Sequence, residues 1–233
     1  LSTAYVAGST TNHLYAIHNY GELTITDSSD AKTGKISARG IFNYGTLTLE
    51  SGTINACDGN GGYGVRNYEG AEFIMNGGSI VTSNEDGDAP TEGYDATTLR
   101  VDESATATIN GGTIENNSSA TVASNGFPHP IDNYGVLTIN GGTFTNSANY
   151  SSMRIWCTTD DDTIITINGG TFNGCIDIHN VSDKANKATT TITGGTFNGD
   201  SWSKCSVRLL GFGVDVDEIV CNIEGGEFMK EIK

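Results

Sequence analysis

The chain has 233 residues, of which 36% are hydrophobic, 31 are glycine and only 3 are proline, and its formal net charge is −16. Such a negative charge argues against nucleic acid or an anionic membrane as a partner, because phosphate binding requires clustered Lys and Arg side chains. No apolar run approaches the length that spans a bilayer, and periodic, β-branched apolar residues exclude a disordered chain.

A degenerate repeat runs through the whole chain, and its clearest copy, Leu-Thr-Ile-Asn-Gly-Gly-Thr-Phe, spans residues 137–144. The Gly-Gly pairs or their equivalents recur every 24 to 34 residues. A constant core with variable insertions is typical of stacked coils whose loops differ in length. The copies begin at Leu23, Leu47, Phe73, Ala107, Leu137, Ile165, Thr190 and Cys221.

A second marker, Asn-Tyr-Gly, precedes several copies of the first at a fixed offset. Each coil is therefore expected to hold three short β-strands: one ending in Asn-Tyr-Gly, one with the Leu-Thr-Ile alternation, and one beginning after Gly-Gly. A hairpin at Asn-Gly-Gly is not expected, because the period is far longer than that of a hairpin. The clear copies of the marker begin at Asn19, Asn43, Asn67 and Asn133.

Stacked coils predict columns of like side chains at the inter-strand spacing of ~4.8 Å. Two columns come from the Leu-Thr-Ile strand, one beginning Leu23, Leu47, Phe73 and the other Ile25, Leu49, Met75. A third follows the Gly-Gly pairs: Ile54, Ile80, Ile114, Phe144, Phe172, Phe197 and Phe228. A fourth is Ile17, Ile41, Val65, Leu99, Ile131, Ile155, Ile178 and, approximately, Leu209.

Polar columns are also expected. Asn19, Asn43, Asn67, Asn133 and Asn180 are placed to form a hydrogen-bonded amide ladder at one corner. The five cysteines show no CxxC spacing, which argues against a zinc or redox site. Two alternatives stay open for them: disulfides between neighbouring coils, within the pairs Cys157 with Cys175 and Cys205 with Cys221, or buried free thiols.

These repeats resemble those of right-handed parallel β-helix proteins of the pectate-lyase-like architecture. In particular they resemble secreted, repetitive adhesin-like bacterial surface proteins and phage fibres and spikes. The resemblance implies an all-β, right-handed, single-stranded parallel β-helix of about eight coils with three short strands per coil, forming one domain over residues 1–233, as a mature protein or a fragment of a longer chain. It also implies an extracellular, secreted or cell- or virion-surface location and a glycan or host-surface ligand. It supplies no catalytic residues, because no lyase or hydrolase motif is matched.

The most varied predicted column is the outward one on the Asn-Tyr-Gly strand. Aromatic and cationic side chains along one ridge suit sugar rings and carboxylated glycans, whereas an ordinary solvated strand face is the alternative. The candidate ligand-binding residues are His18, Phe42, Arg66, Arg100, Asp132, Trp156, His179 and Arg208. A second outward column, mostly threonine, is either a water-ordering array of the ice-binding kind or a set of good strand formers.

Acidic loops are the remaining candidates for chemistry. Asp160, Asp161 and Asp162 are the candidate Ca²⁺ ligands, although no EF-hand or nonapeptide motif is present. No other cofactor is expected. Catalysis of glycan cleavage needs two carboxylates flanking the bond, whereas Asp132 is expected to be isolated between Arg100 and Trp156, with no stacked Asp or Glu pair in the strands.

The sequence therefore predicts a non-catalytic, extracellular β-helix module for adhesion or surface binding, with a glycan as the expected ligand. Its partners would be a glycan or a host- or cell-surface ligand, without nucleic acid or membrane insertion, in a homo-oligomer or a larger surface assembly. Two alternatives remain: a structural fibre, spacer or virion decoration protein, and a polysaccharide lyase or glycoside hydrolase.

Overall fold

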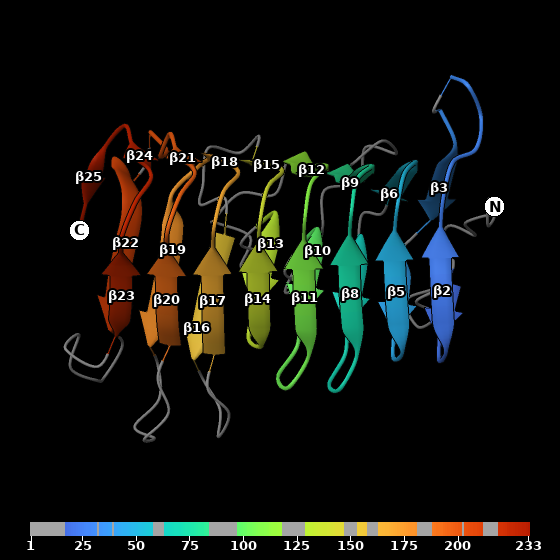
Figure 1. Cartoon of the computed structure of the whole chain (residues 1–233), viewed down its shortest axis with the longest axis horizontal. Helices are drawn as coiled ribbons and strands as arrows, with labels where there is room; N and C mark the ends of the chain where they lie inside the picture. The colour runs from blue at the N-terminus through green and yellow to red at the C-terminus, as the bar shows by residue number, and fades with distance from the viewer. Residues whose placement is uncertain are drawn as a thin grey trace, which may run out of the picture.

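The computed structural model of the chain describes residues 17–31, 33–38, 40–57, 63–83, 97–117, 129–146, 153–157, 163–180, 188–201, 203–211 and 219–233. For residues 37, 38, 57, 83, 155–157, 180 and 188 only the backbone is described. These segments form a parallel β-solenoid in which successive coils stack along one axis (Figure 1). Within them, no helix is long and apolar enough to cross a membrane.

Three parallel sheets form the walls of the solenoid, and each coil contributes one strand to each. Sheet 1 contains β1 (Ile17–Asn19), β4 (Ile41–Asn43), β7 (Val65–Asn67), β10 (Leu99–Val101), β13 (Ile131–Asn133), β16 (Met153–Cys157), β19 (Ile176–Asn180), β22 (Cys205–Gly211) and β25 (Glu231–Ile232). Sheet 2 contains β2 (Glu22–Ile25), β5 (Thr46–Leu49), β8 (Glu72–Met75), β11 (Thr106–Ile109), β14 (Val136–Ile139), β17 (Thr163–Ile167), β20 (Ala188–Ile192) and β23 (Val220–Ile223). Sheet 3 contains β3 (Lys35–Ala38), β6 (Thr53–Cys57), β9 (Ser79–Ser83), β12 (Thr113–Asn117), β15 (Thr143–Asn146), β18 (Thr171–Asn173), β21 (Thr196–Phe197) and β24 (Glu227–Phe228).

The chain winds in a right-handed sense. In Figure 1 it climbs the front of the molecule through the strands of sheet 2, crosses the top through sheet 3 and returns behind through sheet 1, while it advances from the N-terminus at the right to the C-terminus at the left. The predicted fold class is therefore confirmed.

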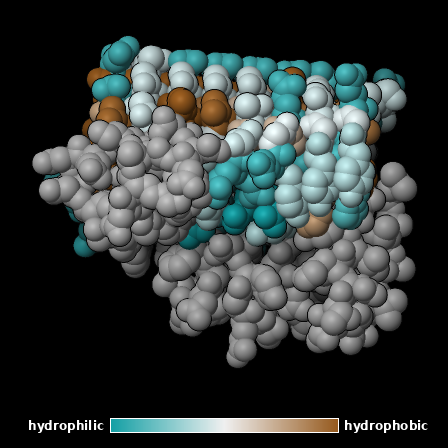
Figure 2. Space-filling view, turned by 90° about the horizontal axis from the view of Figure 1, so that it is seen from below, coloured by the Kyte–Doolittle hydropathy of each residue, from teal (hydrophilic) through white to brown (hydrophobic). Residues whose placement is uncertain are grey.

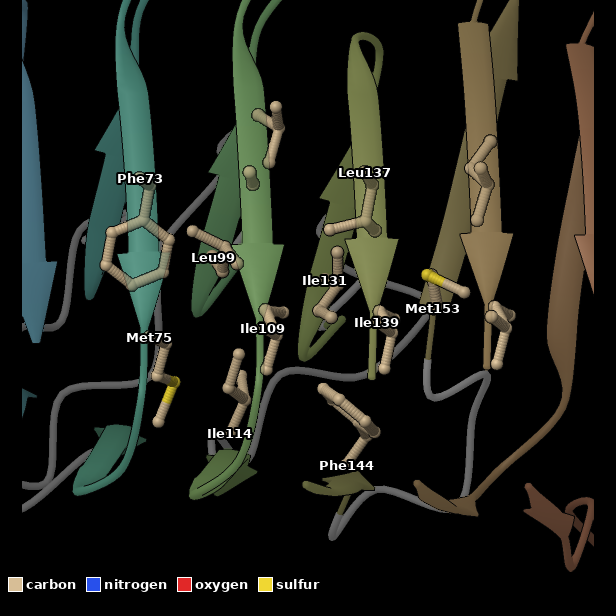
Figure 3. Packing of buried hydrophobic residues seen from close by; sticks show 14 of the residues in the cluster. Phe73, Met75, Leu99, Ile109, Ile114, Ile131, Leu137, Ile139, Phe144 and Met153 are labelled. Carbon is tan, nitrogen blue, oxygen red and sulfur yellow. The ribbon is translucent and has the colours of Figure 1, made fainter. Parts of the chain in front are cut away.

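The core is a set of apolar columns inside the three sheets. Figure 3 shows side chains such as Phe73, Leu137 and Ile131 directed from the sheets into the common interior. The register aligns Ile109 with Ile139 and Ile139 with Ile167, so the first and second predicted columns are confirmed. The third is confirmed as well, and its phenylalanines stack face to face. Ring centroids are 4.7, 4.9 and 4.6 Å apart from Phe144 through Phe228.

The fourth predicted column is wrong in its last three members. Ile131 pairs with Met153, which pairs with Ile176 and then Val207, so Ile155, Ile178 and Leu209 lie two residues beyond the column. Because side chains alternate between the two faces of a strand, a shift of two residues keeps the same face inward. Hydrophobic alternation alone therefore does not distinguish the two registers.

The corner between sheets 2 and 3 is turned by the second glycine of each Gly-Gly pair. Gly78 has a φ of 78°, and a Cβ atom there would lie 2.6 Å from the carbonyl oxygen of Gly52 in the preceding coil. In the described segments the non-glycine residues with positive φ are Ser104 and Lys204. The asparagine of Asn-Gly-Gly is not among them, so it does not adopt the left-handed conformation of the second glycine. Its role is instead cross-coil: the side-chain amides of Asn76, Asn110, Asn140 and Asn168 bond in an exposed ladder at 2.8–2.9 Å.

A second amide ladder, buried between sheets 1 and 2, confirms the predicted one over its first three members. Asn19 donates to Asn43, and Asn43 to Asn67, each at 2.7 Å. The ladder then stops because Val101 occupies the next rung. Asn133, one rung further, is fully buried, and its Oδ1 has no hydrogen-bond partner. Asn180 is not in this column, because it pairs with Cys157 and Gly211.

This gap in the ladder makes an unusual substitution testable. Val101→Asn places an amide between Asn67 and Asn133, where it can donate to the orphaned Oδ1. We expect Val65→Asn, a control with apolar neighbours Ile41 and Leu99, to lower the free energy of unfolding by ~2–4 kcal/mol. Val101→Asn should lower it by less than half as much in urea unfolding, and equal losses would contradict the ladder.

Candidate functional site

The predicted ridge lies on the outer face of sheet 1, and its first five members are in register. His18 pairs with Phe42, Phe42 with Arg66, Arg66 with Arg100, and Arg100 with Asp132. Each of these side chains follows an inward Ile, Val or Leu, and strand alternation turns it away from the core. This part of the ridge is therefore confirmed as one column.

The rest of the predicted ridge is displaced by the same two residues as the core column. Asp132 pairs with Arg154, Arg154 with Asp177, and Asp177 with Arg208. Trp156 and His179 pair with each other in the neighbouring outward column, where Leu210 follows. The structure thus keeps Arg208 in the ridge but replaces Trp156 and His179 with Arg154 and Asp177. The side chain of Trp156 lies outside the described residues.

At the N-terminal end of sheet 1, five aromatic side chains form a cluster, which we call the aromatic face: His18, Tyr20, Phe42, Tyr44 and Tyr68. The three tyrosine rings stack along the axis with centroids 4.8 and 4.3 Å apart and planes within 16° of parallel. Both faces of the Tyr44 ring are covered by its neighbours, so it presents its edge and hydroxyl group. Tyr20 is 74% exposed although one of its faces contacts Tyr44, so its other face is open.

Toward the C-terminus the same face carries a charged column, Arg66, Arg100, Asp132, Arg154, Asp177 and Arg208, in which charges alternate from Arg100 onward. Arg154 holds Asp132 with two hydrogen bonds of 3.0 and 2.8 Å. Arg208 holds Asp177 in the same way, at 2.9 and 2.8 Å. Such two-bond arginine–carboxylate pairs are strong and fix the geometry of both partners.

Asp102, one residue beyond β10, joins the first two arginines of the charged column. Its carboxylate accepts from Arg66 Nε at 2.9 Å and from Arg100 Nε at 2.6 Å. The two guanidinium groups also lie over the rings of Tyr68 and Tyr134, each 4.4 Å from the ring centroid. Burial alone would lower the pKa of Arg100, but Tyr134 and Asp102 raise it above its ordinary value.

The middle of the charged column is nearly closed to solvent. The Asp132 side chain is fully buried, and those of Arg154 and Asp177 are 6% and 7% exposed. A buried arginine that is already bonded to a carboxylate is not available to a carboxylated glycan. This part of the predicted ridge is thus a structural feature of the fold, whereas His18 is exposed and Arg66, Arg100 and Arg208 are partly exposed.

His179 lies beside the charged column and is 7% exposed. Its pKa is lowered to about 4, first because burial disfavours the imidazolium and then because Arg154 and Arg208 repel a further positive charge. Asp132 opposes this shift but does not cancel it. The imidazole is therefore neutral at physiological pH.

Asp132 lies between Arg100 and Arg154 instead of between Arg100 and Trp156, and the next carboxylate of the column, Asp177, is two rungs away, at ~10 Å by the inter-strand spacing. That separation is close to the carboxylate spacing of inverting glycosidases, ~6.5–9.5 Å. However, Arg154 lies between the two carboxylates in the column, and each carboxylate accepts two hydrogen bonds from an arginine. Since neither reaches the surface, the pair has no access to a substrate in this arrangement.

The other two predicted sites are the acidic loop and the outward threonine column. Asp160, Asp161 and Asp162 lie outside the described residues, and within those residues no group of three or more His, Cys, Asp or Glu side chains is arranged to hold a metal ion. The outward threonine column of sheet 2 is in register but is interrupted by Ile74. In Figure 2 hydrophilic residues gather over the middle of the visible surface and hydrophobic ones form separate small spots.

Sequence reasoning missed the tyrosine stack, Asp102, Arg154 and Asp177. The tyrosines carry a signal, because the Asn-Tyr-Gly marker puts a Tyr at the same place in successive coils. The register shift beyond Asp132 has no comparable signal in the sequence, because apolar residues are buried in either register. Comparisons with known protein families, with curated proteins and with solved structures find no match.

The buried pair makes a testable prediction about stability. Arg154→Met removes both hydrogen bonds of the buried Asp132 carboxylate and leaves it the longer contact with Arg100, at 4.0 Å, so we expect it to lower the free energy of unfolding by ~3–5 kcal/mol. Adding Asp132→Leu should restore most of that loss. Arg66→Met, whose side chain is 27% exposed, is the control and should cost ~1 kcal/mol or less. Urea unfolding of the four proteins measures this, and a double variant no more stable than Arg154→Met would contradict it.

The lowered pKa of His179 predicts an acid-dependent loss of stability. The unfolded chain binds a proton at about the ordinary value of 6.5 whereas the folded chain does so only near 4. The free energy of unfolding therefore has its full value, as far as His179 is concerned, above pH ~6.5. It falls as the pH falls toward ~4, and the loss is about 2–3 kcal/mol at pH ~4.5.

His179→Gln removes this titration, so the stability difference between wild type and variant should change by that amount between pH ~7.5 and pH ~4.5. A pH-independent difference for His179→Gln would contradict the assignment.

Proposed function

We propose that this chain is a non-catalytic, extracellular β-helix module that binds a glycan at the aromatic face. The observation that carries the proposal is the open ring face of Tyr20, which is 74% exposed at the end of a tyrosine stack. Solvent-exposed aromatic clusters on a soluble protein mark interaction surfaces. The apolar C–H face of a sugar ring packs on such a ring, and neighbouring hydroxyl groups can bond to the sugar hydroxyls.

The geometry of the aromatic face supports a rigid, preformed contact surface. Tyr44 stacks on Tyr68, and Phe42 packs edge-on against the Tyr68 ring at 5.2 Å. Rings held by their neighbours lose little conformational freedom on binding, which lowers the cost of association. His18, exposed and 5.3 Å from Phe42, adds a polar group at the same surface.

The electrostatics favour a neutral glycan over a polyuronate. The chain carries a formal net charge of −16. Arg66, whose guanidinium group lies over Tyr68, is already bonded to Asp102. A polyanion would therefore meet repulsion with little local compensation.

A purely structural role, as a spacer or fibre, is the second candidate. The observation that favours it is that the charged side chains of the column bond to one another. Asp132 and Asp177 each accept two hydrogen bonds from an arginine of the next coil. Side chains used in this way stiffen the rod and leave less of the face for a ligand. The resemblance to fibres and to adhesin-like surface proteins is compatible with either role.

A glycan array followed by calorimetric titration of the best neutral ligand tests the proposal. We expect Tyr20→Ala to weaken binding by about tenfold, because the ring face that the sugar covers is lost. Val136→Ala, a change at an exposed apolar residue on sheet 2, is the control and should leave the affinity unchanged.

Binding to no glycan, or equal affinity for the Tyr20→Ala protein and the wild type, would overturn the proposal and leave the structural role. Release of reducing or unsaturated sugar during the incubation would overturn the non-catalytic part of it.

A further inference from the structure

The sulfur atoms of Cys175 and Cys205 lie 3.0 Å apart, and both cysteines are fully buried and in the thiol form. Two unbonded sulfur atoms in ordinary contact lie farther apart than this. The distance exceeds the ~2.05 Å of an S–S bond by about 1 Å, a gap that small side-chain rotations close. Neither pair suggested by the sequence spacing, Cys157 with Cys175 or Cys205 with Cys221, is the one that the fold brings together.

The backbone around the two thiols also suits a covalent link. Cys175 directly precedes β19 and Cys205 opens β22, and these strands are neighbours in sheet 1, paired from Ile176 and Val207 onward. This register places Cys175 and Cys205 one residue out of step, and a strand spacing of ~4.8 Å with an offset of ~3.3 Å gives a Cα separation of ~6 Å, within the ~4.4–6.8 Å that disulfides span.

A network of hydrogen bonds holds this corner of the two coils. The carboxylate of Asp200 accepts from the backbone N–H of Cys175 at 3.2 Å and from both the backbone N–H and the hydroxyl of Ser203. Asp200 itself is 6% exposed, and its backbone carbonyl accepts from Lys230 of the last coil. The segments that carry the two thiols are therefore tied to each other independently of the sulfur contact.

The link joins successive coils close to strands whose apolar side chains are more exposed than their partners in the preceding coil. Ile223 pairs with the buried Ile192 and is 39% exposed, and Ile232 pairs with the buried Val207 and is 46% exposed. Cys175 precedes β19 and Cys205 lies in β22, so a link between them joins the coil of β19, β20 and β21 to the coil of β22, β23 and β24.

We propose that Cys175 and Cys205 form a disulfide that locks these two coils together. In the reaction the two thiols lose their protons and two electrons, one S–S bond forms, and a disulfide oxidant such as oxidised glutathione is reduced to two thiols through a mixed disulfide. Burial raises the pKa of the Cys175 thiol, so the attacking thiolate is scarce in the folded chain and the bond forms most readily while the coils close. The proposal stands apart from glycan binding.

The test is refolding of the full chain in a glutathione redox buffer, followed by alkylation of free thiols in denaturant and peptide mapping. We expect a cross-linked peptide pair containing Cys175 and Cys205, and an intact mass lower by two hydrogen atoms. The oxidised protein should melt ~5–10 °C above the reduced one in calorimetry, since the link closes a long loop of the unfolded chain.

Matched variants separate this link from general effects of thiol removal. Cys175→Ser and Cys205→Ser should each abolish both the cross-linked peptide and the response of the melting temperature to reductant. Cys221→Ser, a change at a half-buried thiol in the next strand, β23, should preserve both. Free thiols at both positions after refolding, or a cross-link of either cysteine to Cys57, Cys157 or Cys221, would overturn the proposal.

Discussion

Parallel stacking of like side chains at the inter-strand spacing is the constraint on which the rest of this structure depends. Every coil must offer its neighbour a backbone edge and the same kind of side chain at each position, because each strand pairs with the equivalent strand above and below. For apolar residues this produces columns such as Phe144, Phe172 and Phe197, whose rings stack at 4.7 and 4.9 Å. The period of the repeat is free to vary, because insertions leave the solenoid between strands.

The same constraint acts on polar groups, with less tolerance. An amide that donates upward needs an acceptor on the next rung, as Asn43 has in Asn67, and a missing partner leaves a buried atom unsatisfied, as at Asn133. Like charges stacked at this spacing would repel, so the charged column alternates in sign from Arg100 to Arg208. In the N-terminal part of the same face, stacked aromatic rings take the place of charged side chains, so no repulsion arises. These rings are the part of the face that a ligand can reach.

The sequence predicted most of the architecture because the fold is periodic. Three apolar columns, the three strands per coil and the amide ladder through Asn67 follow from repeated residues at fixed offsets. The prediction failed where the marker degenerates after Asp132, because a shift of two residues preserves the hydrophobic alternation. What decides the register there is the pairing of Arg154 with Asp132, a contact between side chains of different coils that no single coil encodes. The contact of Cys175 with Cys205 was hidden for the same reason, since it depends on the length of the turn before each strand rather than on spacing in the chain.

Distances between spin labels along one outward column of sheet 2 test the central claim most directly. Thr24, Thr48, Thr138, Thr166 and Thr191 lie on one line in this register. With Ile74 and Thr108 filling the rungs between them, Thr48 is four rungs from Thr166 and Thr24 is six rungs from Thr191. Labels at these two pairs should be ~19 and ~29 Å apart, an increase of ~5 Å for each rung whatever the separation in sequence. Distances that do not rise in proportion to the number of rungs would contradict one-directional stacking of the coils.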